Sequence, residues 1–167
     1  MNAHEPSGLL KYTWTEADFT EMGWSDCIIH AISVGGYDGE QDDERIPNGR
    51  LLLDLDYIVR WVKPVPPSPY YSYWIAPATL VFDNAWNMDG GITPADDGLL
   101  EVFELERLPP PDDWPHPVWD FHGWNFRLSV RATGYTQYIR QQPQHTTTSP
   151  LTMAQRGGLG FAEVPFG

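Results

Sequence analysis

Asp54 and Asp56 have the residue type and the spacing that metal binding or acid–base catalysis requires. In a β-strand, side chains two positions apart point to the same face, with their backbones roughly 7 Å apart. Two carboxylates this close can bind a hard cation, and each raises the proton affinity of the other. Asp120 and His122 have the same spacing in a second candidate strand. If the two strands are neighbours, the four side chains form a divalent-metal site that activates water, as in a metal-assisted hydrolase.

The same residues also have a purely structural interpretation. Asp54 and Asp56 can form a solvated polar face with Arg60 as a counter-charge. Asp120 and His122 can be ordinary surface residues. A sequence does not give the order of strands in a sheet, so it does not decide between the two interpretations.

Tryptophans are a second group of candidate site residues. The chain holds 8 of them, and Trp114, Trp119 and Trp124 fall close together between residues 112 and 125. A flat apolar ring with a polar border suits sugars and proline-rich peptides, so exposed tryptophans predict carbohydrate or peptide binding. Buried tryptophans simply fill a core. We predict Trp114 and Trp119 as contact residues, with Trp114 exposed because prolines and acidic residues surround it.

Nucleophilic and cofactor chemistry has little support in the sequence. Cys27 begins the apolar stretch CIIHAISV, which predicts a buried, inert thiol rather than an activated nucleophile. His30 lies in the same stretch and is predicted as a core histidine with a hydrogen-bonded neighbour. The sequence contains no G-x-S-x-G elbow, H-E-x-x-H pair, phosphate-binding glycine loop or dinucleotide fingerprint. We therefore assign no catalytic residue and expect no cofactor.

Acidic residues dominate the charge of the chain. It holds 10 Lys and Arg against 23 Asp and Glu, a formal net charge of −13, and residues 1–120 contain 22 of the acidic side chains. Nucleic acids and anionic membranes bind clustered cations, so we expect neither as a partner. The charge attracts a basic protein instead, with Asp42, Asp43 and Glu44 in a turn-rich connection as predicted contacts. Charge that serves solubility alone is the alternative.

The length of 167 residues corresponds to one domain, and a hydrophobic content of 41% supplies one core. No apolar run reaches the roughly 18 residues of a membrane span, and the first residues do not resemble a secretory signal. One cysteine cannot form an internal disulfide. These features predict a cytoplasmic protein and leave its oligomeric state open.

Short elements must position these side chains, because 16 prolines and 15 glycines interrupt the chain. One helix is predicted over 15–22, with Thr15 as its cap, Asp18 as the capping partner and Gly23 as the stop. Most of the other elements alternate apolar and polar residues with the period of a strand. Strands are predicted at 27–34, 50–62, 73–86, 99–108, 118–132 and 135–140.

These strands predict a mainly β fold, an antiparallel sandwich or barrel-like sheet with one short N-terminal helix. The stretch 27–34 is apolar on both alternations, which predicts a central strand buried on both faces. The strand over 50–62 is expected to point one set of side chains into the core: Leu51, Leu53, Leu55, Tyr57, Val59 and Trp61. The chain is expected to form a single domain, 1–167, with a largely irregular C-terminal segment from residue 141.

Three stretches carry a resemblance: WSDCIIH at 24–30, LLLDLDYIVRWV at 51–62 and WIAPATLVFDNAW at 74–86. Over residues 20–90 the chain resembles a family of small uncharacterised bacterial proteins. The resemblance implies a compact bacterial domain and brings no reaction, ligand or site residue with it. In size and acidity the chain is also similar to immunity proteins, which bind and inhibit toxins. The preferred interpretation is a non-enzymatic protein that binds another, basic protein.

Overall fold

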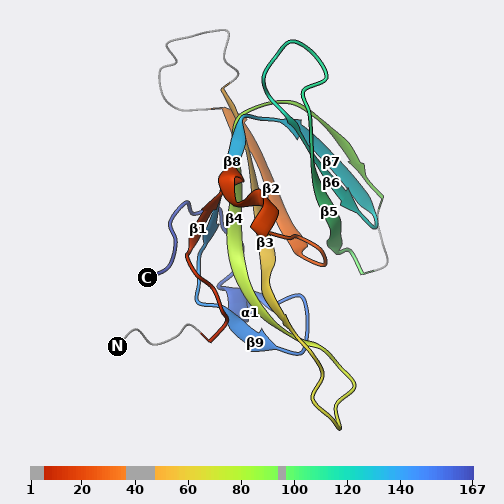
Figure 1. The fold of residues 1–167 in the computed structure, drawn as a ribbon, viewed down its shortest axis with the longest axis vertical. Coiled ribbons are helices and arrows are strands. Elements are labelled where there is room, and N and C mark those ends of the chain that lie inside the picture. Colours follow the sequence, from red (N-terminus) through yellow and green to blue (C-terminus); the bar gives the residue numbers. More distant parts are fainter. Residues whose placement is uncertain (1–5, 37–47, 94–96) are drawn as a thin grey trace.

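The computed structural model describes residues 6–36, 48–93 and 97–167 (Figure 1). The fold is mainly β, as the sequence predicts. The strands are β1 (Thr13–Thr15), β2 (Ile28–Gly36), β3 (Gly49–Val62), β4 (Ser72–Ile92), β5 (Leu100–Leu108), β6 (Val118–Gly123), β7 (Phe126–Arg131), β8 (Gly134–Ile139) and β9 (Gln144–Thr146). The helical elements are the 3-10 helix η1 (Glu16–Glu21) and the short α-helix α1 (Met153–Arg156).

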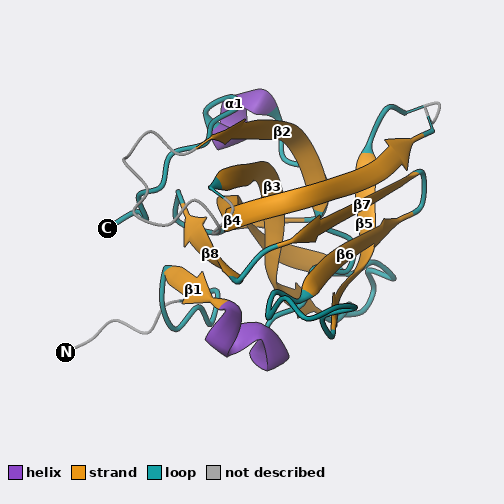
Figure 2. Cartoon of the chain, turned by 90° about the horizontal axis from the view of Figure 1, so that it is seen from above, coloured by secondary structure: helices purple, strands orange, loops and turns teal. Residues whose placement is uncertain are grey.

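The strands pair in the order β1-β8-β4-β3-β2-β5-β6-β7, and β9 adds to β4. A further pairing between β4 and β7 returns the order to β4, so six of the strands form a closed circuit of antiparallel neighbours. The 21-residue strand β4 makes this possible, because it pairs with β3 and β8 first and with β7 near its end. Figure 2 shows β4 running from β3 and β8 to the side of β7. Phe82 of β4 contacts Trp119 and Phe121 of β6, so the core lies between β4 and β6.

The helix predicted over 15–22 is present as η1 and is one residue shorter at each end. Thr15 and Asp18 form the predicted capping box, in which the side chain of each accepts a backbone hydrogen bond near the helix start. Phe19 of this helix packs against Trp119, with ring centroids 5.6 Å apart. The helix therefore covers one side of the core.

β3 follows the predicted alternation over most of its length. Its core-facing side chains are buried: Leu51, Leu53, Leu55 and Tyr57. A β-bulge between Ile58 and Arg60 then shifts the register against β4. Beyond the bulge Trp61 pairs with Tyr73, which shares a face with Ile75, the partner of Ile58. The prediction that Trp61 faces the core with Leu55 and Tyr57 is therefore wrong. Trp61 lies on the opposite face of the strand, the face of Ile58, and is 43% exposed.

β2 lies between β3 and β5, but it is buried on both faces only at its start. It pairs with β5 through Ile28 and Ile29, and both side chains are buried. Beyond them, β3 is the only neighbour of β2 in the described part of the chain, and Ile32 and Val34 are exposed. The prediction that this strand is buried on both faces is therefore confirmed for Ile28 and Ile29 and is wrong for Ile32 and Val34.

The chain after β8 forms β9, α1 and loops, and it packs back onto the sheet. The amide of Phe166 donates to the carbonyl of Ile139 at 3.0 Å, and its ring lies 4.2 Å from that of Tyr12. These contacts hold the end of the chain against β8 and the residues before β1. Among the residues that the structure describes, no helix has the length and apolar character needed to cross a membrane.

Candidate functional site

Asp54 and Asp56 share a guanidinium partner on one face of β3, and both are completely buried. This partner is Arg156 of α1. Its Nη2 and Nη1 atoms lie 2.7 and 2.9 Å from the two carboxylate oxygens of Asp54, and its Nε lies 3.1 Å from Asp56 Oδ1. One guanidinium thus compensates two carboxylates, and the counter-charge is not Arg60. Arg60 donates to the carbonyl of Pro6 instead.

We call Asp54, Asp56 and Arg156 the ionic cluster. Its further partners come from several parts of the chain. Arg140 Nη2 lies 2.8 Å from Asp54 Oδ1. The amide of Gly160 donates to Asp54 at 2.9 Å, and the amide of Leu151 donates to Asp56 at 2.8 Å. The cluster therefore anchors the C-terminal segment to the middle of β3.

With these partners, Asp54 is held as a carboxylate that has no room for a metal ion. Burial by itself raises the pKa of Asp54. Hydrogen bonds from Arg156, from the Gly160 amide and from Arg140 outweigh burial and hold the pKa below its usual range. The oxygen atoms that a cation would need already accept these hydrogen bonds.

This arrangement predicts acid sensitivity. The pKa of Asp54 is lower in the folded than in the unfolded chain, so its stabilising contribution is complete above the unfolded pKa and is lost as the pH falls through the folded one. Asp18 and Asp112, whose pKa values Lys11 and Arg131 lower, act in the same direction. We expect the free energy of unfolding to decrease below about pH 4, by up to about 1.4 kcal/mol per pH unit for the proton that Asp54 takes up. Urea denaturation between about pH 7 and about pH 3 measures this, and equal stability at both ends would contradict it.

Asp120 and His122 are neighbours on β6, but they do not meet the aspartates of β3. β2 and β5 separate β3 from β6 in the strand order. Arg127 binds Asp120 at 2.7 and 3.2 Å, and His122 Nε2 lies 3.2 Å from Glu106 Oε1. Across the described ranges, no group of three or more His, Cys, Asp or Glu side chains could hold a metal ion. The structure therefore does not form the predicted four-residue metal site of Asp54, Asp56, Asp120 and His122.

The two tryptophans predicted as contact residues have different environments. Trp119 is completely buried, and its Nε1 donates to the carbonyl of Ala132 at 3.1 Å. It fills the core, so it is not a surface anchor. Trp114 is 44% exposed and packs beside Trp86 and His116. A binding role for Trp114 stays a prediction.

Asp42, Asp43 and Glu44, the predicted acidic contacts, lie outside the described residues. The described residues do show how the uneven charge of the chain is compensated. Each arginine of residues 121–167 forms an ion pair with an aspartate from residues 1–120. These arginines are Arg127, Arg131, Arg140 and Arg156. The basic end of the chain therefore binds acidic groups of the protein itself.

Cys27 and His30 have the environments that the sequence predicts. Cys27 is completely buried, and burial raises the pKa of its thiol to about 12. The thiolate that nucleophilic attack requires is therefore not formed near neutral pH. His30 is largely buried, with Nε2 3.0 Å from Asp56 Oδ2.

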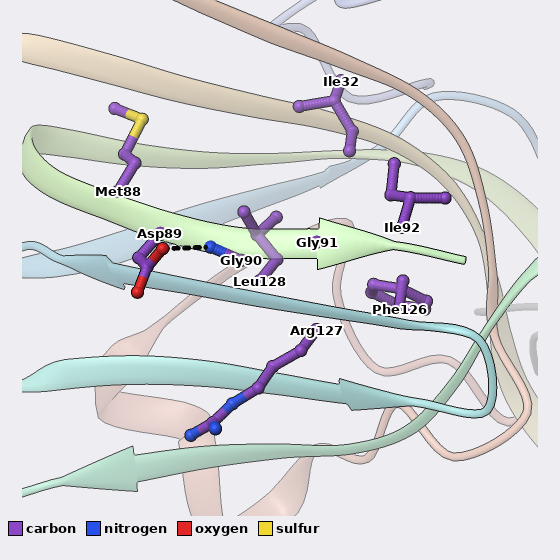
Figure 3. A pocket seen from close by; sticks show the side chains of 9 residues that line it. All are labelled: Ile32, Met88, Asp89, Gly90, Gly91, Ile92, Phe126, Arg127 and Leu128. Carbon is purple, nitrogen blue, oxygen red and sulfur yellow. Dashed lines mark hydrogen bonds between the residues drawn. The ribbon is translucent and has the colours of Figure 1, made fainter.

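A hollow of about 440 Å³ lies between β2 and the paired ends of β4 and β7. Figure 3 shows the residues that line it. Most of its lining side chains are apolar: Ile32, Met88, Ile92, Phe126 and Leu128. Asp89 and Arg127 also line it, but the Arg127 side chain points away from the apolar residues and binds Asp120 (Figure 3). The hollow therefore offers mainly apolar packing to a ligand.

A second hollow, which we call the aromatic hollow, lies where β3 ends and β4 begins. Its volume is about 490 Å³, and it is lined by Trp61, Ser68, Pro69, Tyr70, Tyr71, Tyr73 and Thr147. Trp61 contacts Tyr71 and Tyr73 edge to face, with ring centroids 6.1 and 4.6 Å apart. Trp61, Tyr70 and Tyr71 are all exposed, so this aromatic cluster faces solvent.

Trp61 and Tyr73 also line a smaller hollow of about 230 Å³, which we call the acidic hollow. The rest of its lining consists of Asp26, Ile28, Ile58, Leu99, Glu101 and Ser149. Burial raises the pKa of Glu101. A hydrogen bond with the Asp26 side chain and the negative charges of Asp26 and Asp97 raise it further. Among the described residues, no Lys, Arg or His forms an ion pair with Asp26 or Glu101.

The backbone positions the two carboxylates of the acidic hollow. Asp26 has a φ of 66°, in the left-handed region that Asp adopts more readily than most residues, and its amide donates to the carbonyl of Val102 at 2.8 Å. Glu101 pairs with Ile28 in the short ladder between β2 and β5. The turn before β2 and the start of β5 therefore hold two acidic groups beside each other.

Reasoning from the sequence misses both hollows. Alternation assigns Trp61 to the core, whereas the bulge turns it outward. Asp26 and Glu101 are far apart in the chain and meet only through the β2–β5 pairing. The one available signal is the run of prolines and tyrosines over 63–73, because prolines cannot extend a central strand and so bring aromatic residues to the surface.

The two hollows share the wall formed by Trp61 and Tyr73. One hollow is aromatic and the other is acidic. A comparison of the chain with protein-family models, with curated proteins and with solved structures finds no match.

Proposed function

We propose that this protein is a cytoplasmic, non-enzymatic binding protein whose partner is a basic protein, with the wall of Trp61 and Tyr73 at the centre of the interface. One observation carries the proposal: solvent-facing aromatic side chains surround two adjoining hollows, one of which holds carboxylates without a described cation. Tyrosine and tryptophan dominate interface hot spots, since each buries a large area with few rotatable bonds.

The charge of the chain supports a basic partner. The net charge of −13 attracts a cationic protein at long range and raises the association rate at low salt. Asp26, Asp97 and Glu101 concentrate negative charge next to the shared wall. Their mutual repulsion is relieved when a cation from another molecule enters.

Two matched tryptophan variants test where the partner binds. Trp61→Ala removes the tryptophan of the shared wall, and Trp114→Ala removes a tryptophan of almost equal exposure, 44% against 43%. In affinity capture at low salt, we expect the wild-type chain and Trp114→Ala to retain the same basic protein. We expect Trp61→Ala to bind it about 30-fold more weakly, the effect of losing a hot spot of about 2 kcal/mol.

Three outcomes would contradict the proposal. Loss of capture in Trp114→Ala but not in Trp61→Ala would move the interface to the loop before β6. A captured partner that stays bound at high salt would contradict the electrostatic argument. Quenching of tryptophan fluorescence by neutral oligosaccharides, lost only in Trp61→Ala, would identify a carbohydrate-binding protein instead.

A further inference from the structure

The geometry points to an arginine side chain of the partner as the occupant of the acidic hollow, with the adjacent residues of the same partner segment packed in the aromatic hollow. This inference rests on the proposed function and specifies the chemistry of the partner. It follows from the size of the two hollows, from their charge and from the aromatic wall between them.

The sizes of the two hollows fit a peptide segment. Small-molecule sites usually have volumes of about 300–1,000 Å³. The acidic hollow, at about 230 Å³, is smaller than this and suits one long side chain. The aromatic hollow, at about 490 Å³, has room for the residues that follow. Because the hollows share Trp61 and Tyr73 as lining, one extended segment can occupy both.

The negative charge of the acidic hollow favours the binding of a cation from another molecule. The protein itself shows the matching arrangement in its ionic cluster, where the single guanidinium of Arg156 binds both Asp54 and Asp56. Asp26 and Glu101 are also neighbouring acidic groups; a hydrogen bond joins their side chains, and no described arginine forms an ion pair with either of them. An incoming guanidinium would do for this pair what Arg156 does inside the protein.

The lining favours arginine over lysine. A guanidinium is a planar fork that binds two carboxylates at once and stacks on aromatic rings, whereas an ammonium is a point charge. This protein already uses such contacts: Arg131 Cζ lies 4.4 Å from the ring centroid of Trp86. Trp61 and Tyr73 offer similar rings, and apolar residues such as Ile58 can cover the methylene stem.

A pair of small probes tests this inference directly. Nα-acetyl-arginine amide and Nα-acetyl-citrulline amide have nearly the same shape, but only the first carries a charge. In NMR titrations at low salt, we expect the arginine compound to shift the indole signal of Trp61 with a dissociation constant near 1 mM, about −4 kcal/mol. We expect the citrulline compound to bind at least about tenfold more weakly.

Charge-matched variants locate the bound cation. Asp26→Asn with Glu101→Gln removes two negative charges from the hollow and is expected to abolish the shift. Asp113→Asn with Glu21→Gln removes two charges from exposed residues that do not line the hollow, and it is expected to keep the shift. Neutralising the first pair relieves like-charge repulsion, so we expect that variant to stay folded, and a thermal unfolding curve checks it.

The results separate this inference from the proposed function. Equal binding of the two compounds, or an unchanged shift in the Asp26→Asn, Glu101→Gln variant, overturns the arginine assignment. Capture of a basic protein that requires Trp61 but survives the Asp26→Asn, Glu101→Gln change would keep the proposed function and overturn the inference. A normal arginine shift without any captured partner would support the pocket and overturn the proposed function.

Discussion

Replacing Arg156 with leucine is expected to lower the free energy of unfolding by about 3–5 kcal/mol. The side chain is completely buried, and it donates to both Asp54 and Asp56. Without it, Arg140 is the described guanidinium that still binds Asp54, and Asp56 loses its arginine partner and keeps only His30 and the amide of Leu151. A buried charge that loses its partner keeps the cost of leaving water and gains nothing in return.

Equilibrium unfolding in urea near neutral pH measures this effect, and two further variants define its origin. Arg156→Lys keeps the charge but loses the planar fork, so we expect an intermediate loss. Lys11→Met breaks an exposed ion pair, in which Lys11 Nζ lies 2.7 Å from Asp18 Oδ1. We expect it to cost at most about 1 kcal/mol. If Arg156→Leu were no more destabilising than Lys11→Met, the ionic cluster would not anchor the C-terminal segment.

The ionic cluster also shows what a local pattern can and cannot predict. The spacing of Asp54 and Asp56 predicts that they share a face and can bind a cation together, and Arg156 supplies a positive charge to both. The identity of the cation was not predictable, because Arg156 comes from the far end of the chain. Its short helix, α1, has too few residues to give a periodic signal.

Local patterns succeed where one rule decides the structure. Thr15 and Asp18 form the predicted capping box because both partners lie within one turn. The leucines at 51, 53 and 55 enter the core because a regular strand alternates its faces. The same rule fails at Trp61, since a bulge adds one residue and reverses the alternation beyond it.

The candidate site could not be predicted because it depends on those irregular features. The bulge in β3 brings Trp61 to the surface, and the β2–β5 ladder brings Glu101 near Asp26. Neither feature leaves a periodic trace in the sequence. Bulges often turn a side chain toward a functional site, so the failure of alternation at Trp61 agrees with its proposed role.

The tryptophan that the sequence predicts as a surface anchor gives the second large effect. Trp119→Ala is expected to lower the free energy of unfolding by about 3–5 kcal/mol. The indole packs between Phe19 and Tyr135, with ring centroids 5.6 and 5.3 Å away, so its removal opens a cavity in the core. The change also leaves the buried carbonyl of Ala132 without the indole donor.

Two comparison variants separate the packing of Trp119 from a binding role. Trp119→Phe keeps an aromatic ring but loses part of the indole volume and the N–H donor, so we expect a smaller loss of about 1–2 kcal/mol. Trp114→Ala removes a half-exposed ring and is expected to cost about 1 kcal/mol or less. Urea denaturation of all three variants measures these differences. If Trp119→Ala and Trp114→Ala unfolded at the same urea concentration as the wild-type chain, Trp119 would not be a core residue, and the packing of β6 against η1 and β8 would be wrong.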